Sequence, residues 1–313
     1  FNPYVTNGGH VGSVTCTVTN ISLEGFTLTT ADGYHPGFGI ALFGHQNAKL
    51  NNVEITGCTN HWAVTVFGNN TEIRGLQIRN AGWIYRDGIH MLGGDGIAIA
   101  NCDITSGDDA LAFGGGTQLD VSIKNVTVAN CVVSSSHGHA VRVAIENTSA
   151  TNAHSGFVIS GVVGYAGLQR NGLVYMHSDS TNMTYGINDV TLRGLRLTHG
   201  GIAGHGGYAV GAAYGVRMTK MNGVLLDDVN VGQTPFRNFF VENCGRVTLS
   251  HCTGGGPQTN FIAQPIYANT VSDLRLIGGS FVNENGIDTD TVTLTAVDKF
   301  QAIGTAFGHT LAT

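Results

Sequence analysis

Three aspartates and one histidine occupy the same place in successive repeats of this chain. Asp87, the pair Asp108-Asp109, and His139 each come shortly before a short apolar segment. Equivalent positions of stacked β-repeats lie about 4.8 Å apart, so these side chains would meet in one cluster. Carboxyls that close do not all ionise easily, so one should hold a raised pKa and another should stay charged. An acid and a base of this kind are what cleavage of a glycosidic bond needs.

Each member of the cluster also has an ordinary structural explanation. The Asp-Asp pair follows Ser-Gly, a common turn sequence, and Asp87-Gly88 is a turn in most proteins. His139 alone would more often be a hydrogen-bonded surface histidine. The column as a whole therefore indicates a catalytic acid cluster, whereas no single residue does. No further set of ligands converges on it, so we expect neither a metal nor another cofactor.

The cluster depends on a repeat of apolar strand, turn and apolar strand, with a period of roughly 20 to 35 residues. This pattern predicts an all-β fold, a parallel β-helix of about ten coils that forms a single domain over residues 1–313. The coils are expected to begin near Asn20, Asn47, Asn70, Asp95, Val121, His154, Ile187, Met221, Gly245 and Val271.

Alternation within the second strand of each repeat assigns an inward and an outward column. The expected inward column is Ile40, Val64, Ile89, Leu111, Val141, Leu173 and Val210. The expected outward column is Ala41, Thr65, His90, Ala112, Arg142, Val174 and Gly211. The turn column two places before the inward one is Phe38, Trp62, Asp87, Asp109, His139, Asn171 and Tyr208. Acids are costly to bury, so the turn column should face a groove beside the small outward residues.

Side chains around the acids should bind a sugar chain. His137 and His139 could tune the acids or orient a sugar, and aromatic residues such as Trp62 and Trp83 offer flat faces to sugar rings. Taken singly, Trp62 and Phe38 would more often pack under a loop. The expected substrate-binding residues are Trp62, Arg86, His90, His137, Arg142, Asn171 and Tyr208.

The composition fits a solenoid and excludes several kinds of protein. The chain has 46 glycines, 5 prolines and 12% charged residues, which suits many tight turns better than helices. A net charge of −6 without a basic patch argues against a nucleic-acid partner. No apolar run approaches the length that spans a membrane. The chain begins at Phe1 without a signal peptide, so we expect a processed or trimmed product.

The six cysteines do not resemble a disulfide framework. Cys58, Cys102 and Cys131 each follow the first strand of a repeat, and Cys252 has a similar place. Because such positions stack, we expect buried thiols in a ladder. A Cys244–Cys252 bridge remains an alternative that spacing does not decide.

These segments resemble the polygalacturonase family of pectin-degrading glycoside hydrolases, which are right-handed parallel β-helix proteins. The family's Asn-Thr-Asp-Gly-Ile motif is similar to residues 85–89, with Arg86 in place of threonine. Its Gly-Asp-Asp-Cys and Gly-His-Gly motifs are similar to residues 107–110 and 138–140, and the resemblance covers roughly residues 47–200. It implies that Asp108 donates a proton, that Asp87 and Asp109 hold the attacking water, and that His139 supports them. It also implies inversion, which close stacking of acids leaves undecided.

One departure bears on the substrate. The family continues with Asn-Gly-Val-Arg-Ile-Lys, whose two cations read the substrate carboxylate, whereas residues 171–176 carry neither cation. Arg142, Arg170 or His177 could replace them; otherwise the substrate is a different, even neutral, polysaccharide. We favour a changed sugar over a displaced cation.

Other functions remain open on the same scaffold. A polysaccharide lyase could use Arg142 to neutralise a uronate and His139 to remove a proton. Phage tailspike depolymerases share the scaffold as trimers, and a glycan-binding solenoid would use the acids only as turn residues. We therefore expect a polysaccharide partner, a monomer or homotrimer, and an extracellular location, secreted or on a phage particle.

Overall fold

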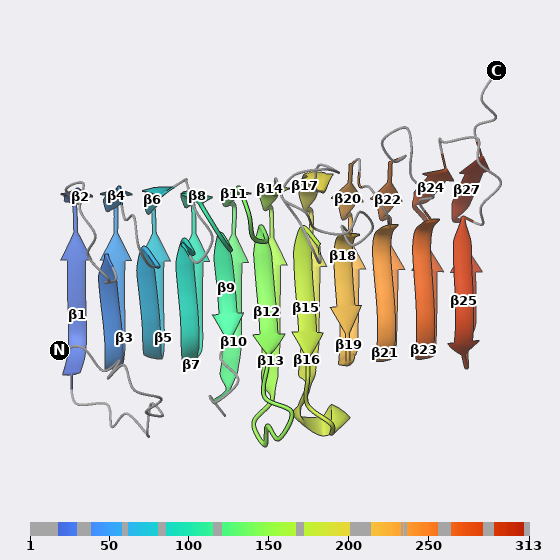
Figure 1. The fold of residues 1–313 in the computed structure, drawn as a ribbon, viewed down its shortest axis with the longest axis horizontal. Helices are drawn as coiled ribbons and strands as arrows, with labels where there is room; N and C mark the ends of the chain where they lie inside the picture. Colours follow the sequence, from blue (N-terminus) through green and yellow to red (C-terminus); the bar gives the residue numbers. More distant parts are fainter. Residues whose placement is uncertain are drawn as a thin grey trace.

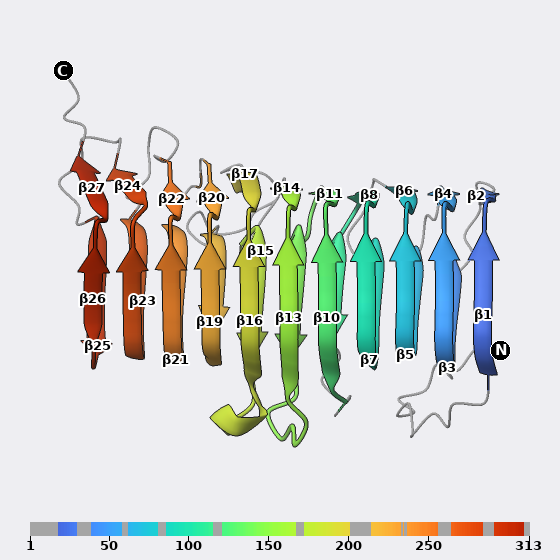
Figure 2. The ribbon, with the colours of Figure 1, turned by 180° about the vertical axis from the view of Figure 1, so that it is seen from behind.

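A computed structural model describes the chain over residues 18–29, 39–57, 62–80, 86–114, 121–166, 172–200, 214–232, 234, 237–255, 264–283 and 291–309. Within these ranges nearly every element is a strand, and the only helix is the 3-10 turn η1 (Met183–Tyr185). The strands follow one another in a single row from the N-terminal to the C-terminal coil (Figure 1). The view from behind shows the same row (Figure 2).

The strands form two sheets, and every strand pair between described residues is parallel. The long-strand sheet contains β1 (Val18–Glu24), β3 (Ile40–Asn51), β5 (Val64–Arg74), β7 (Ile89–Ala100), β9 (Leu111–Gly114), β10 (Ile123–Ala129), β12 (Val141–Ile145), β13 (His154–Ser160), β15 (Val174–Ser178), β16 (Ile187–Arg193), β18 (Tyr214–Thr219), β19 (Met221–Asp227), β21 (Arg237–Ser250), β23 (Gln264–Ile277), β25 (Val292–Val297) and β26 (Phe300–Ile303). The short-strand sheet contains β2 (Thr27–Thr29), β4 (Glu54–Thr56), β6 (Gln77–Asn80), β8 (Asp103–Ser106), β11 (Val132–Ser135), β14 (Val163–Ala166), β17 (Arg196–Gly200), β20 (Asn230–Val231), β22 (Thr253–Gly254), β24 (Ser280–Asn283) and β27 (Ala306–His309).

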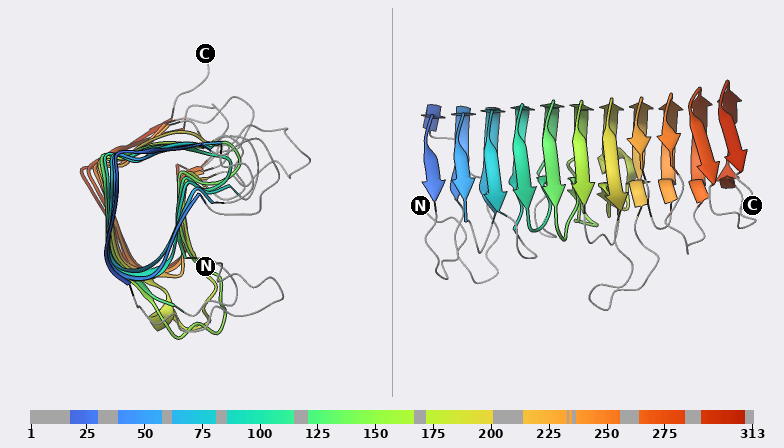
Figure 3. Two further views of the ribbon diagram at one scale, coloured as in Figure 1. Left: turned by 90° about the vertical axis from the view of Figure 1, so that its left-hand side faces the viewer. Right: turned by 90° about the horizontal axis from the view of Figure 1, so that it is seen from above.

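Each coil gives one strand to the short-strand sheet, so the described part of the chain contains 11 coils. The expectation of about ten was close, and the additional coil is the last one, β25 to β27. The end-on view shows the coils superimposed around a common interior (Figure 3). The predicted parallel β-helix is therefore confirmed.

A left-handed residue begins the turn of each coil from the long-strand sheet into the short-strand sheet, and in one coil a second one, Gly279, follows Gly278. Left-handed backbone suits residues that tolerate positive φ, chiefly glycine and asparagine, which explains part of the Gly/Asn-rich composition. The corner residues have φ between 50° and 68° and are Gly25, Asn52, Gly75, Asn101, Asn130, Gly161, Gly194, Asp228, His251, Gly278 and Gly304.

Inward side chains of successive coils stack into one apolar core. Val64, Ile89, Leu111 and Val141 are register neighbours, and all four are fully buried. Burying an aliphatic side chain of this size contributes about 1.5–3 kcal/mol relative to leaving it exposed. The expected register of the two columns is therefore correct from Ile40 through Val141. Three residues of the expected outward column are nevertheless buried, namely Thr65, His90 and Ala112.

Beyond Val141 the expected register is wrong by one residue. Val141 pairs with Val174, so Tyr175 rather than Val174 is the outward neighbour of Arg142. Leu173 is buried and apolar, as an inward strand residue would be, but it lies level with Ala140 in the turn. In the following coil Val174 pairs with Val216 of β18, whereas the strand expected at residues 209–212 lies outside the described residues.

The described cysteines are free thiols. Cys102, Cys131, Cys244 and Cys252 are all buried, so the alternative Cys244–Cys252 bridge is not formed. Each of these thiols donates to the carbonyl two residues before it, at 3.3 to 3.4 Å. The expected stacking is confirmed for Cys102 and Cys131, whereas Cys58 lies outside the described residues. No helix in the described ranges is long and apolar enough to cross a bilayer.

Candidate active site

The acids lie where the chain returns from the short-strand sheet to the long-strand sheet. Asp87 precedes β7, Asp108 and Asp109 connect β8 to β9, and His139 connects β11 to β12. Backbone hydrogen bonds from Gly88 N to Asp109 O and from Ala110 N to His139 O, both 2.8 Å, place three neighbouring coils in register. The turn column predicted for Asp87, Asp109 and His139 is therefore present.

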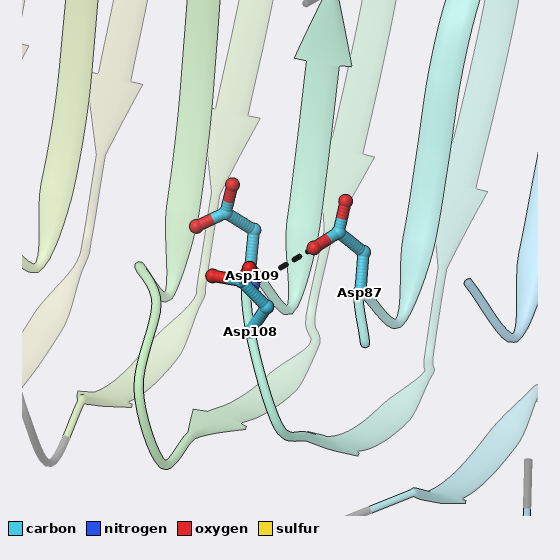
Figure 4. A group of neighbouring side chains, drawn as sticks. All are labelled: Asp87, Asp108 and Asp109. Atoms are coloured by element: carbon cyan, nitrogen blue, oxygen red, sulfur yellow. Dashed lines mark hydrogen bonds between the residues drawn. The ribbon is translucent and has the colours of Figure 1, made fainter. Parts of the chain in front are cut away.

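The three carboxyls form one cluster, drawn in Figure 4. Each offers an oxygen that lies within 4.8 Å of the others. The backbone N–H of Asp109 donates to Asp87 Oδ1 at 3.1 Å, which fixes the two coils against each other (Figure 4). Asp87 is 4% exposed and Asp109 6%, whereas Asp108 is only partly buried. The most accessible acid is thus Asp108.

Asp109 is held in its charged form by three contacts. Its Oδ1 accepts hydrogen bonds from the backbone N–H of His139 at 2.8 Å and from His139 Nδ1 at 2.6 Å. Its Oδ2 lies 3.6 Å from Nε of Arg142. Burial would raise the pKa of Asp109, but His139 and the Arg142 guanidinium outweigh it and lower the pKa to about 2. Asp109 is consequently ionised at every ordinary pH.

Asp87 shows the opposite electrostatic behaviour. Burial, followed by the negative charge of Asp109, raises the pKa of Asp87 well above its usual range. Its Oδ2 contacts Nδ1 of His90, and the ring of His90 stacks on Trp62 with centroids 3.7 Å apart. Two identical residue types one coil apart thus hold opposite pKa shifts, because burial dominates at Asp87 and nearby positive charge dominates at Asp109.

A glycine lets the coil of His139 pack directly against the acids. A Cβ on Gly138 would lie 2.4 Å from both the backbone carbon and Oδ1 of Asp108. Such an approach is closer than real side chains reach, so any side chain at this position would displace Asp108. Gly138 therefore lets the coil pack closely enough for His139 to reach Asp109.

The comparison with known families agrees with this geometry. The family model described as "Glycosyl hydrolases family 28" matches residues 10–163, a stretch that contains Asp87, Asp108, Asp109 and His139. The chain is a polygalacturonase-like glycoside hydrolase. No curated protein matches it.

Two of the residues predicted to bind substrate, His90 and Arg86, contact the acid turns of the protein itself. His90 is 4% exposed, and Trp62 covers one of its faces, so His90 faces Asp87 rather than open solvent. Arg86 supports the acid turn through its carbonyl, which accepts the N–H groups of Gly107 and Asp108 at 3.1 and 3.0 Å.

His137 and Arg142 also contact neighbouring protein groups. His137 Nδ1 lies 2.9 Å from the hydroxyl of Ser136. Arg142 forms ion pairs with Asp109 and Glu146, so its charge is largely balanced within the protein. This arrangement weakens its predicted part in reading a substrate carboxylate or in lyase chemistry.

Two predicted members of the turn column lie outside the described residues, namely Asn171 and Tyr208. The register of β12, β15 and β18 shows that Gly172 and Tyr214 are level with His139 instead. The assignment of Asn171 and Tyr208 to substrate binding therefore stays a prediction.

A band of rings and guanidinium groups lies beyond His139, which the register expected from the sequence did not predict. Tyr175 stacks on His139 with centroids 4.9 Å apart, and the guanidinium carbon of Arg217 lies 5.6 Å from the centre of the Tyr175 ring. The correct register of β15 would have predicted this band from alternation alone. We call it the ring–arginine strip: Tyr175, Tyr214, Arg217, Arg237, Phe240 and Tyr267.

The acid cluster is also the only group of potential metal ligands among the described residues. Its buried oxygens, however, already face donors: Asp87 Oδ1 and Asp109 Oδ1 accept N–H groups, and Asp87 Oδ2 contacts an imidazole. This donor environment suits carboxyls used for proton transfer better than a cation site.

Proposed function

We propose that this hydrolase cleaves glycosidic bonds of a polysaccharide with inversion of the anomeric centre. Asp108 donates a proton to the leaving oxygen, while Asp109 and Asp87 hold and activate the attacking water. The observation that carries the proposal is the convergence of three carboxyls from two neighbouring coils within 4.8 Å. A glycan-binding protein would need no such cluster of acids.

The accessibility of the three acids supports these roles. The proton donor must reach the glycosidic oxygen, and Asp108 is the most exposed of the three. Asp109 is charged and fixed by His139 and Arg142, which suits a group that accepts hydrogen bonds from water. Asp87 borders Asp109 on the neighbouring coil and completes the water site.

The hydrogen-bond contacts of the two buried carboxyls support attack on the sugar by water rather than by a carboxylate. In a retaining glycosidase one carboxylate attacks the sugar directly. Here both oxygens of Asp87 and both oxygens of Asp109 already face N–H or imidazole groups. A short distance between the acids would by itself favour retention, so the family resemblance and these contacts together support inversion.

The substrate is proposed to lie along the turn column and to continue onto the ring–arginine strip. Tyr175 lies one coil beyond Arg142, and Arg217 lies two coils beyond it, or roughly 10 Å along the stack. The Arg217 guanidinium lies over the rings of Tyr175, Tyr214 and Phe240, and its planar group suits contacts with an anionic or hydroxyl-rich sugar.

The central test is Asp108→Asn, assayed as new reducing ends from a panel of plant and bacterial polysaccharides. We expect activity to fall by about 10²–10⁴, the usual contribution of a general acid, with the fold and glycan binding intact. Asp103→Asn is the matched control, since Asp103 lies in β8 of the same coil and pairs with Arg79 on the surface. A loss of less than about tenfold in Asp108→Asn would reject the assigned role.

Product analysis separates the remaining alternatives. Hydrolysis adds one water to the product mass, whereas a lyase gives an unsaturated product that absorbs in the ultraviolet. Proton NMR early in the reaction identifies the anomer released, and the opposite anomer to that of the substrate is expected. Release of the same anomer would overturn inversion while leaving hydrolysis intact.

We also propose that the hydrolase acts outside the cell, as a free enzyme or as part of a phage particle, because its substrate is a polysaccharide. A free monomer and a tailspike-like homotrimer predict the same chemistry. Light scattering distinguishes them by mass.

A further inference from the structure

His90 occupies an unusual place in the outward column, buried beside the acids. It stands in the outward column between Thr65 and Ala112, both fully buried, and is itself 4% exposed. The small neighbours leave room for an imidazole ring that lies against Asp87. Its Nδ1 contacts Asp87 Oδ2.

Asp87 is anchored on both sides of its carboxyl. Oδ1 accepts the backbone N–H of Asp109, so a proton carried by Asp87 must reside on Oδ2. Oδ2 is the atom that His90 contacts. The ring of Trp62 stacks on the imidazole of His90 with an angle of 22° between the two ring planes. Trp62 thereby fixes the orientation of the imidazole.

We infer that His90 is a positioning residue that holds Asp87 in the same place whether or not Asp87 carries a proton. A neutral imidazole has one N–H and one lone pair, and it can exchange them between its two nitrogens. Nδ1–H donates to the ionised carboxylate, and the Nδ1 lone pair accepts from the protonated carboxyl. One proton therefore lies between Nδ1 and Oδ2 in both states.

The charged groups around Asp87 explain why a positioning residue such as His90 is useful. Asp87 is faced by Asp108 and Asp109, by the imidazoles of His90 and His139, and by the guanidinium of Arg142. A change of charge on any of these groups during catalysis alters the protonation of Asp87. His90 itself stays neutral, because burial, reinforced by the positive charge of Arg142, lowers its pKa to about 3.

The inference rests on the proposed role of Asp87 in holding water. It assigns Trp62 as a support for His90, in contrast to the platform for sugar rings that the sequence suggested. Replacing Trp62 should consequently lower kcat through Asp87 more than it raises KM.

The test compares His90→Leu with His90→Asn, whose amide can also donate or accept. Hydrogen bonds to charged groups are stronger than those to neutral ones, so removing His90 disfavours ionised Asp87 most. In His90→Leu we expect the pKa of Asp87 to rise by about one pH unit. The acidic limb of the kcat/KM profile should move by the same amount, and kcat should fall at least tenfold with KM within twofold. His90→Asn should recover most of kcat.

Carbon-13 NMR of labelled aspartate, assigned with Asp87→Asn, reports the titration of Asp87 independently of activity. An unchanged titration and an unchanged profile in His90→Leu would overturn the inference. A raised Asp87 pKa without any loss of kcat would keep the contact but reject the proposed role of Asp87. If His90→Leu does not fold, the same two measurements on Trp62→Leu decide the matter, since unchanged values there reject the positioning role.

Discussion

Two aspartates at equivalent positions of neighbouring coils differ in charge because their partners differ. Asp109 has an imidazole and a guanidinium around it, which outweigh the cost of burial and lower its pKa. Asp87 has a neutral imidazole and the negative charge of Asp109, so burial prevails and raises its pKa. Residue type alone therefore does not set the role of an active-site acid; the sign of the nearest charge does.

Asp87 should lower the stability of the native state. Its native pKa lies above its ordinary value, so at higher pH the protein must bury a charge that the unfolded chain exposes to water. Below about pH 4 the carboxyl is protonated in both states and the cost disappears. We expect Asp87→Asn to raise Tm by about 2 °C or more at neutral to alkaline pH, with the gain shrinking toward pH 4. Thermal unfolding at several pH values tests this, and an equal Tm at all pH values would contradict it.

At the scale of the element, the turn between the short-strand and long-strand sheets decides where the acids point. The turns that carry Asp87, Asp109 and His139 keep the same register, so alternation predicts their neighbours correctly. The turn before β15 does not, and Leu173 takes a turn position that resembles a strand position. Small residues at such turns are a packing requirement of adjacent coils.

Gly138 is the clearest case of this requirement. Gly138→Ala would place a methyl group 2.4 Å from the backbone of Asp108, so the turn must shift. Overpacking of this kind costs about 1–3 kcal/mol, and a displacement of about 1 Å can cost 10²-fold in rate. We expect kcat to fall at least tenfold while strand content, measured by circular dichroism, is retained. Gly25→Ala is a control for side-chain addition, because a Cβ there meets nothing within 4 Å, although its positive φ adds some strain.

At the scale of the whole molecule, stacking converts distant segments into one continuous surface. His139, Tyr175 and Arg217 come from three coils. The rings of His139 and Tyr175 are 4.9 Å apart, and the guanidinium carbon of Arg217 lies 5.6 Å from the centre of the Tyr175 ring. The stack continues through Phe240 and Tyr267, whose rings are 5.2 Å apart and nearly parallel. A polymer bound at the acids can therefore meet several coils at once.

This surface predicts a selective effect of Arg217→Leu. Losing a charge-assisted contact away from the reacting bond should raise KM about tenfold for long substrates and leave kcat within about twofold. Arg275→Leu is the matched control, because Arg275 pairs with Asp273 on an exposed part of β23. Steady-state kinetics with long and short oligosaccharides measures the effect, which should be lost for chains too short to reach the strip. Equal KM values for Arg217→Leu and the control would exclude the strip from substrate binding.

The sequence by itself determined the parallel β-helix, the alignment of its first coils and the meeting of Asp87, Asp108, Asp109 and His139. It could do so because the turn residue and the alternating strand that follows it recur in the same order up to Val141. Only the tertiary structure decided the register beyond Leu173, the burial of His90 and the opposite pKa shifts of two like residues. These properties depend on turn lengths and on charges from other coils, which a linear pattern does not contain.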